Sequence, residues 1–409
     1  MKRNSTITYL MLFFYFSSTL SLPIQYFLGV GLYKYAASFL LAYSAFAFIS
    51  ANKKINLTAI NRTNLGLLIY ILFLFYGFIS GLLNNGIIDA ILGLVEYSFY
   101  ALPLMLLLSA GLIEYKNLIF ITKINSYMAV LIGMIGVYQY FYDFLLFGIY
   151  NDTEFEELAS WSVKRIPSIM ISIQIYSAYM CLSAVGIWLV KPFEAKHNII
   201  FIVLILSLGS LSGSQTIIFV ALVMIIFGFA SINWSEFIYA STLILIITVA
   251  AYYSSVDFMD IDPFLRIISV IDFDTALKFF GQINSSRFDI WMESILNTPI
   301  LAGNGFGSAS LLAHGSERFN TESYILQVYY ETGLIGLILW FFSFGLNTMI
   351  KKPKEHLSKG IIALTIYIFF GFVVHVFFSI NLFYTWLLFF GYFSTKNSGV
   401  ILKEGRIFS

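Results

Sequence analysis

The sequence predicts an all-helical polytopic membrane protein with about twelve transmembrane helices and one large loop outside the membrane. Of its 409 residues, 59% are hydrophobic and 11% are charged. Soluble domains are about 45–50% apolar and about 25% charged. Long windows, among them 65–83, 217–232 and 237–256, contain no charged residue, and a membrane-spanning helix needs roughly 20 apolar residues. These features exclude a soluble globular domain.

Twelve apolar segments are candidate spans, and their ends are placed only to within several residues. The seventh and eighth are short and are joined by residues 209–214, so they are either two tilted spans that meet at a bend or one re-entrant pair. The segments are residues 6–22, 35–50, 64–83, 88–111, 124–147, 167–190, 198–212, 215–231, 237–254, 322–348, 360–378 and 381–395.

The distribution of basic residues predicts the orientation, because Lys and Arg accumulate in cytoplasmic loops. With the N-terminus in the cytoplasm, 16 of the 23 basic residues lie on the cytoplasmic side and 7 lie outside. An even number of spans places both termini in the cytoplasm. The chain then divides into a membrane bundle at 1–254, a large outer loop at 255–321, and a second bundle with a cytoplasmic tail at 322–409.

The large outer loop carries local signals for short helices and a tight turn. Residues 264–280 alternate apolar and charged side chains, which is typical of a helix on the membrane surface or capping the bundle. A serine followed three residues later by Asp289 resembles a capping box. It predicts a helix of about 11 residues that ends near Asn297, since Pro299 opposes continuation. Residues 303–307 (Gly-Asn-Gly-Phe-Gly) predict a tight turn.

Arginine is scarce, and four of the seven arginines fall on the outer side. Arg287 lies one helical turn before Trp291 and would suit a bidentate clamp on a phosphate or pyrophosphate. A rim charge near lipid headgroups is the simpler alternative. Arg165 ends the first outer loop at the mouth of a span, where positive charge runs against the usual bias. The glycine-rich turn could offer backbone N–H groups to an anion, although spacing alone favours an ordinary turn.

Three acidic residues fall at or within predicted spans, where ionisable groups are costly and usually functional. They are Glu96, Glu322 and Glu331. Glu331 could instead cap a buried polar network, and an acid at a helix start can simply complement the helix dipole. No metal site is expected, because the single cysteine is Cys181 and the histidines, His314 among them, lack ligand spacing. A net charge of +1 predicts no binding to nucleic acid.

Four motifs follow one another from the outer loop into the tenth span. They are Ser-Arg-Phe-Asp-Ile-Trp at 286–291, Pro-Ile-Leu-Ala-Gly-Asn-Gly-Phe-Gly at 299–307, Glu-Ser-Tyr-Ile-Leu-Gln at 322–327, and Glu-Thr-Gly-Leu-Ile-Gly at 331–336. This ordered set resembles the O-antigen polymerase and ligase superfamily, which are bacterial membrane glycosyltransferases with many spans and one large periplasmic loop before the last few helices. The resemblance in motifs covers about 50 residues, and the span count and loop placement extend it across most of the chain.

Two details are closer to the polymerase branch than to the ligase branch. The polymerase pattern has an arginine, fifteen residues and a glycine, and Arg287 and Gly303 match it. Ligases have His-Asn where this chain has Glu322 and Ser323. The chain also departs from the family, because a second arginine pattern would need glycine where Tyr176 stands, and the mid-chain Ser-Arg is replaced by Ser-Gln at 214–215.

The resemblance implies a C-type glycosyltransferase-like bundle in the bacterial inner membrane, with a cavity under the periplasmic loop. The implied reaction joins undecaprenyl-pyrophosphate-linked oligosaccharide units without a metal or other cofactor. A polysaccharide chain-length determinant protein is the implied partner besides the lipid bilayer. Catalytic roles fall to Glu322, Arg287 and Arg165, and substrate binding to Arg318, Arg266, Gly303, Trp291, Glu331 and His314. The alternatives are an O-antigen ligase and a flippase or transporter of lipid-linked oligosaccharides.

Overall fold

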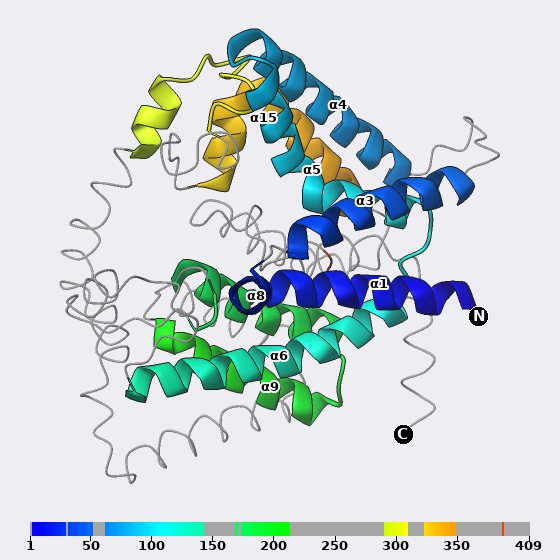
Figure 1. Cartoon of the computed structure of the whole chain (residues 1–409), viewed down its shortest axis with the longest axis vertical. Helices are drawn as coiled ribbons and strands as arrows, with labels where there is room; N and C mark the ends of the chain where they lie inside the picture. The colour runs from blue at the N-terminus through cyan, green and yellow to red at the C-terminus, as the bar shows by residue number, and fades with distance from the viewer. Residues whose placement is uncertain are drawn as a thin grey trace. The chain divides into compact units, whose positions relative to one another are not determined.

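The protein is described here by a computed structural model that covers residues 2–29, 32–51, 62–142, 168–170, 173–212, 290–309, 323–348 and 387. Every regular element within these ranges is helical, as the sequence predicts. The elements are α1 (Lys2–Thr19), α2 (Ser21–Leu28), α3 (Leu32–Ala51), α4 (Arg62–Asn84), α5 (Ile87–Ser109), α6 (Tyr115–Tyr142), α8 (Ile173–Val190), α9 (Ala195–Gly209), the 3-10 turn η2 (Ser210–Ser212) and α15 (Tyr324–Thr348) (Figure 1).

The described helices lie on eight of the twelve predicted spans. Three of them are long and apolar enough to cross a membrane, at Leu65–Asn84, Tyr115–Tyr142 and Tyr324–Ser343. The number rises to five if each of two bent helix pairs counts as one span. The remaining predicted spans, at 215–231, 237–254, 360–378 and 381–395, lie outside the described residues, apart from the single residue Leu387. An all-helical fold with three to five helices long and apolar enough to cross a membrane is therefore confirmed for the described residues, and the count of twelve stays a prediction.

Helix α8 begins later than the sixth span predicted from the sequence, which covers residues 167–190. Residues 168–170 form a turn, and helix α8 begins only at Ile173. Ser168 has a positive φ of 55°, which a continuing helix does not allow. Its hydroxyl donates to the carbonyl of Ile132 at 2.6 Å, and its own carbonyl accepts from Gln139 Nε2 at 3.1 Å. These two bonds hold the turn against α6.

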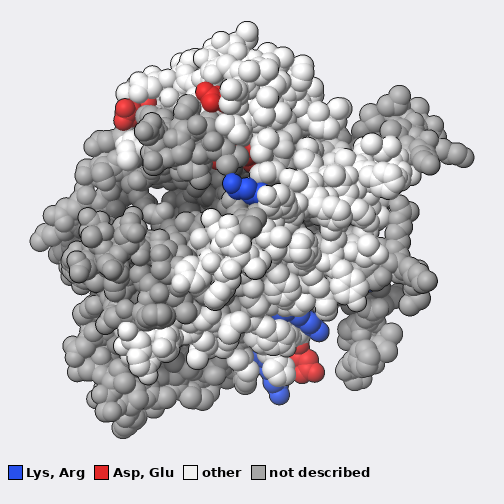
Figure 2. All heavy atoms as spheres, in the orientation of Figure 1, with Lys and Arg blue, Asp and Glu red and all other residues white. Residues whose placement is uncertain are grey.

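The described helices group into two compact units. The first contains α1, α3, α4, α5 and α15, in which α4 packs against both α5 and α15 (Figure 1). The second contains α2, α8, α9 and most of α6, and α8 packs against α9. The described surface in the view of Figure 2 carries few charged side chains, as expected for helices that contact lipid.

Helix α5 is bent by 50° between Phe99 and Ala101. Pro103 lies four residues after Phe99 and has no N–H to donate to the Phe99 carbonyl, so the helical ladder is interrupted at this point. The bend separates the first half of α5, which carries Glu96 and Tyr97, from the second half.

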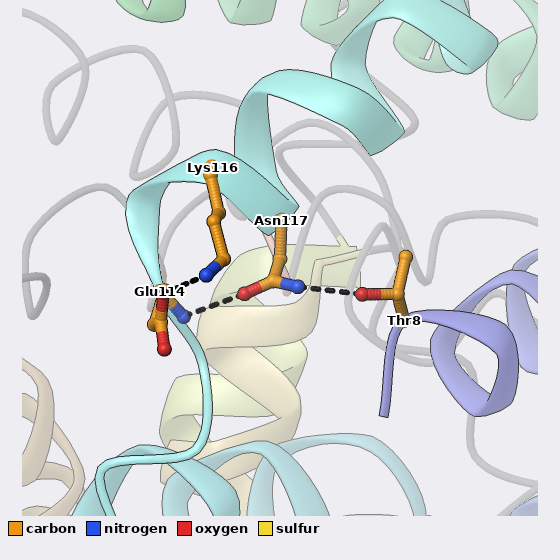
Figure 3. A network of polar contacts seen from close by, with 4 residues as sticks. All are labelled: Thr8, Glu114, Lys116 and Asn117. Atoms are coloured by element: carbon orange, nitrogen blue, oxygen red, sulfur yellow. Dashed lines mark hydrogen bonds and ion pairs between the residues drawn. The ribbon is translucent and has the colours of Figure 1, made fainter. Parts of the chain in front are cut away.

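The turn between α5 and α6 is joined to α1 by a short polar network (Figure 3). Asn117 accepts from the backbone N–H of Glu114 at 2.9 Å and donates to the hydroxyl of Thr8 at 2.6 Å. Lys116 forms an ion pair with Glu114 at 2.7 Å. The side chain of Asn117 thus satisfies a backbone donor at the start of α6, and it links the first residues of α6, which belong to the first unit, to α1.

Candidate functional site

Residues 299–309, here called the docked turn, pack against a break in α15. The break is at Gly333, whose φ of 61° and ψ of −165° are not helical. In a continuous helix the carbonyls of Tyr330 and Glu331 would accept from the N–H groups of Leu334 and Ile335. The break leaves these four backbone groups without their helical partners, and in a buried or lipid environment they need others.

The docked turn supplies all four partners. Asn304 N donates to Tyr330 O at 2.8 Å, and Gly305 N donates to Glu331 O at 2.7 Å. In return, Leu334 N donates to Ile300 O at 2.8 Å and Ile335 N donates to Leu301 O at 3.4 Å. The turn and the broken helix therefore complete each other's hydrogen bonding, although they are about 30 residues apart in sequence.

Glycine is required where the two backbones meet. Gly303 has a φ of 69°, and a Cβ there would overlap the backbone nitrogens of Thr332 and Gly333. Gly333 has a φ of 61°, and a Cβ there would overlap the backbone of Leu301 and Gly303. Both positions thus need a positive φ and the absence of a side chain.

Phe306 anchors the docked turn between α4 and α5. Its side chain is fully buried, and its ring stacks on Tyr97 with centroids 4.5 Å apart and an interplanar angle of 14°. Its backbone N–H donates to Gly77 O at 3.1 Å. Gly77 and Gly81 of α4 and Gly93 of α5 leave room for the turn, because a Cβ on any of them would overlap Phe306 or Gly307.

Asn85, the first residue after α4, fixes the path of the turn. Its Nδ2 lies within hydrogen-bond distance of three successive carbonyls, those of Asn304 at 2.9 Å, Gly305 at 3.2 Å and Phe306 at 3.2 Å. Tyr76 adds a bond from its hydroxyl to Leu301 O at 3.2 Å. An amide nitrogen is suited to this position because it donates and does not accept.

Glu331 holds the far end of the docked turn. Its carboxylate is 0% exposed, and Oε1 accepts from Gly307 N at 3.1 Å and from Ala309 N at 3.0 Å. Gln327, one helical turn earlier, donates to Ala309 O at 3.3 Å. The group to which the glycine-rich turn offers its N–H groups is therefore a carboxyl group of the chain itself.

A second buried carboxylate faces the same region. Glu96 of α5 is 8% exposed and interacts electrostatically with Glu331, as does the neighbouring Tyr97 hydroxyl. Two carboxyl groups within the apolar interior of one helical unit are costly and usually functional. The interpretation of Glu331 as the cap of a buried network accounts for its described contacts.

Of the predicted site residues, Gly303, Trp291 and Glu331 lie in the described ranges. Gly303 and Glu331 are brought together by the docked turn, while Trp291 lies in the helical residues 290–296 that precede it. Its indole Nε1 is buried without a hydrogen-bond acceptor among the described residues. Arg165, Arg266, Arg287, His314, Arg318 and Glu322 lie outside the described residues.

The segments that carry these polar residues join directly to the described scaffold in sequence. Arg287 precedes the first described residue of the short helix, Ile290, by three positions, and Glu322 immediately precedes Ser323. Ser323 caps α15, since its hydroxyl accepts from Leu326 N at 3.3 Å. A scaffold whose turn is tied to the helices by backbone hydrogen bonds suits the positioning of reactive side chains.

Asn85, Phe306, Gln327 and the three helix glycines were not among the residues predicted for the site. One local signal exists for part of this set, because Gly77 and Gly81 form the small-xxx-small pattern that allows close approach to a membrane helix. The other contacts depend on segments far apart in sequence.

A scan against models of known protein families finds no match, and a comparison with curated proteins finds no significant similarity.

Proposed function

We propose that the protein is a membrane glycosyltransferase that polymerises undecaprenyl-pyrophosphate-linked oligosaccharide units into O-antigen or a similar surface polysaccharide. The observation that supports this most is the contact between Gly303–Gly307 and the Glu331–Gly333 break of α15. These are two of the motifs on which the resemblance to the polymerases depends, and they are joined by backbone hydrogen bonds. The proposal includes about twelve spans, both termini in the cytoplasm, and chemistry at the periplasmic face of the bacterial inner membrane.

In the proposed reaction, a hydroxyl oxygen of the incoming lipid-linked unit attacks the anomeric carbon of the growing chain. The bond from that carbon to the carrier pyrophosphate breaks, and the pyrophosphate leaves with the electron pair. Glu322 accepts the hydroxyl proton as general base. Arg287 and Arg165 neutralise the departing pyrophosphate through their planar guanidinium groups, supported by Arg318 and Arg266.

A second candidate is a flippase or transporter of lipid-linked oligosaccharides. Helices interrupted near the membrane midplane are typical of transporters, and both α5 and α15 are interrupted. The break in α15 is filled by the docked turn, however, and its backbone groups are bonded within the chain. A ligase that transfers finished glycan to another acceptor is the alternative within the family.

The location of the accumulating lipid separates these functions. A strain without the protein should accumulate single lipid-linked repeat units on the outer leaflet if the protein is a polymerase. Loss of a flippase would trap those units on the inner leaflet. Loss of a ligase would leave long polymer on the carrier. The measurement is mass spectrometry of lipid-linked oligosaccharides, combined with accessibility of their sugars to an impermeant oxidant.

Site variants test the assignment of residues in the same strain. Arg287→Ala should abolish polymer, and Arg287→Lys should lose most of it because the bidentate geometry is lost. Glu322→Gln should lower the rate by roughly 10²–10⁴-fold if Glu322 is the general base. Arg406→Ala in the predicted cytoplasmic tail is the matched control. Normal polymer in Arg287→Ala and Glu322→Gln would overturn the proposed catalytic roles.

A further inference from the structure

The short helix before the docked turn exposes an apolar face. Among residues 290–296, Met292 is 38% exposed, Ile295 is 42% exposed and Leu296 is 75% exposed. At about 100° per residue these three share one side of the helix, whereas Ser294 and Thr298 point into the protein and are 0% and 5% exposed. Glu293 and Asn297 are exposed as well, on a neighbouring side of the helix. A helix with one exposed apolar side and one exposed polar side is typical of a membrane interface.

The apolar face continues into the docked turn. Ile300 is 68% exposed and Leu301 is 61% exposed. Their carbonyls accept from Leu334 N and Ile335 N, so they lie beside α15 at the level of these two residues. Leu334, Ile335 and Ile338 are themselves 41%, 42% and 45% exposed. The exposed side chains of the turn and of α15 therefore form one continuous apolar strip.

Helix α4 gives the depth of this strip. Tyr76, whose hydroxyl donates to Leu301 O, lies eight residues before Asn84, the end of the α4 span, or about 12 Å. The hydrocarbon core of a bilayer is about 30 Å thick, so this value places Leu301 well inside the α4 span.

The backbone of the turn is compatible with such a depth. Irregular backbone at membrane depth is tolerated only where its polar groups are satisfied by protein or by a water-filled cavity. The carbonyls of residues 300, 301, 304, 305 and 306 all accept hydrogen bonds, and the N–H groups of 303–307 all donate. The carbonyls of Ile300 and Leu301 are thus hydrogen-bonded within the protein.

We propose that residues 296–306 form a re-entrant element that enters the membrane, with Leu296, Ile300 and Leu301 in contact with the acyl chains of the bilayer. This differs from the expectation that the whole of 255–321 is a periplasmic loop. It is independent of the proposed function, because it concerns where the turn lies and holds for a transferase or a transporter.

Site-specific fluorescence quenching in proteoliposomes tests the proposal on the full chain. Single cysteines replace Ile300 and, as a second position, Leu296, in a Cys181→Ala background, and each is labelled with bimane. Both positions are largely exposed, so the label fits without repacking. Leu72, which is 47% exposed within the α4 span, is the lipid-facing reference. Lys116, with a side chain 64% exposed in the first turn of α6, is the reference outside the membrane.

Bimane at position 300 should lose as much fluorescence to phospholipids with brominated acyl chains as bimane at position 72, and it should resist iodide. Position 296 should respond to both quenchers, because it lies nearer the membrane surface. Position 116 should respond to iodide alone. Quenching of position 300 by iodide without quenching by bromolipid would show an aqueous loop and overturn the proposal. Insensitivity of position 300 to both would show a protein contact there and would overturn it as well.

Discussion

The two units of the molecule join their segments by different kinds of hydrogen bond. In the first unit, the docked turn is held to α4 and α15 mainly through backbone groups, and glycines allow the close approach. In the second unit, regular helices are joined through side chains. Asn125 Nδ2 of α6 donates to Ser183 Oγ of α8 at 2.9 Å, and the Tyr176 hydroxyl of α8 donates to Leu208 O at 2.9 Å.

The difference follows from what a helix can offer a neighbour. An intact helix in a membrane uses its backbone groups internally, so only side chains remain for contacts between helices. A broken helix releases backbone donors and acceptors, and α15 releases four of them at Gly333. Such a break must be filled with good geometry, because unsatisfied backbone groups in an apolar interior are costly. The docked turn should therefore tolerate substitution far less than the side-chain bonds of the second unit.

The largest effect is expected at Glu331. Glu331→Leu removes the acceptor of two buried N–H groups, those of Gly307 and Ala309. Leaving a buried donor unsatisfied costs about 1–3 kcal/mol, so the loss should be about 2–6 kcal/mol in total. Unfolding in mixed detergent micelles, followed by tryptophan fluorescence, measures it.

Glu331→Gln is the matched control, because it retains an acceptor oxygen and nearly the same volume. It should lose less than Glu331→Leu, because the side-chain oxygen still accepts from both N–H groups and a neutral acceptor weakens each bond by at most about 1 kcal/mol. Equal stability of Glu331→Leu and the wild type would show that the carboxylate does not hold the turn. Loss of polymer in Glu331→Gln with little loss of stability would indicate a role for its charge in the reaction.

A somewhat smaller effect is expected at the contact of the two backbones. Gly303→Ala introduces a Cβ that meets backbone atoms of Thr332 and Gly333, which cannot move aside as a flexible side chain would. A positive φ costs a non-glycine residue roughly 1–2 kcal/mol, and overpacking adds about 1–3 kcal/mol. The expected loss of about 2–5 kcal/mol is again measured by unfolding in mixed micelles.

Gly111→Ala separates the two contributions. Gly111 has nearly the same φ, +67° against +69° for Gly303, but nothing lies within 4 Å of a Cβ built on it. It should lose only the conformational cost of about 1–2 kcal/mol. A Gly303→Ala protein no less stable than Gly111→Ala would contradict the close packing of the turn on α15.

The sequence predicts the separate helices and the turn of this site better than the contacts between them. The charge-free window at 65–83 locates the span of α4, because burial of a helix in lipid excludes charge over about 20 residues. The end of the short helix before Pro299 and the glycine-rich turn also follow from local chemistry, and residues 290–296 are helical as expected. Each of these elements is determined by residues close together in the sequence, so a local sequence pattern is enough to predict it.

The break at Gly333 and the hydrogen bonds that compensate for it could not be predicted in the same way. Gly333 lies in an apolar stretch that looks like an ordinary span, and glycine is common in membrane helices. The break is stable because residues 300–305 supply the missing partners, and that pairing depends on tertiary contact. Glu331 was predicted to be functional or to cap a buried network, and only its bonds to Gly307 and Ala309 show what it caps.

The smallest effect is expected in the second unit, at Ser183. Its hydroxyl donates to Tyr179 O at 2.7 Å within α8 and accepts from Asn125 Nδ2 of α6. Ser126, also 0% exposed, makes the same kind of local bond, to Thr122 O at 2.7 Å. Hydrogen bonds between side chains of membrane helices average about 0.6 kcal/mol and reach about 1.7 kcal/mol. Ser183→Ala should therefore be less stable than Ser126→Ala by about 0.6 kcal/mol, measured by unfolding in the same micelles. A difference as large as that expected for Gly303→Ala would mean that side-chain bonds hold the second unit as strongly as backbone bonds hold the docked turn, and the contrast between the units would fail.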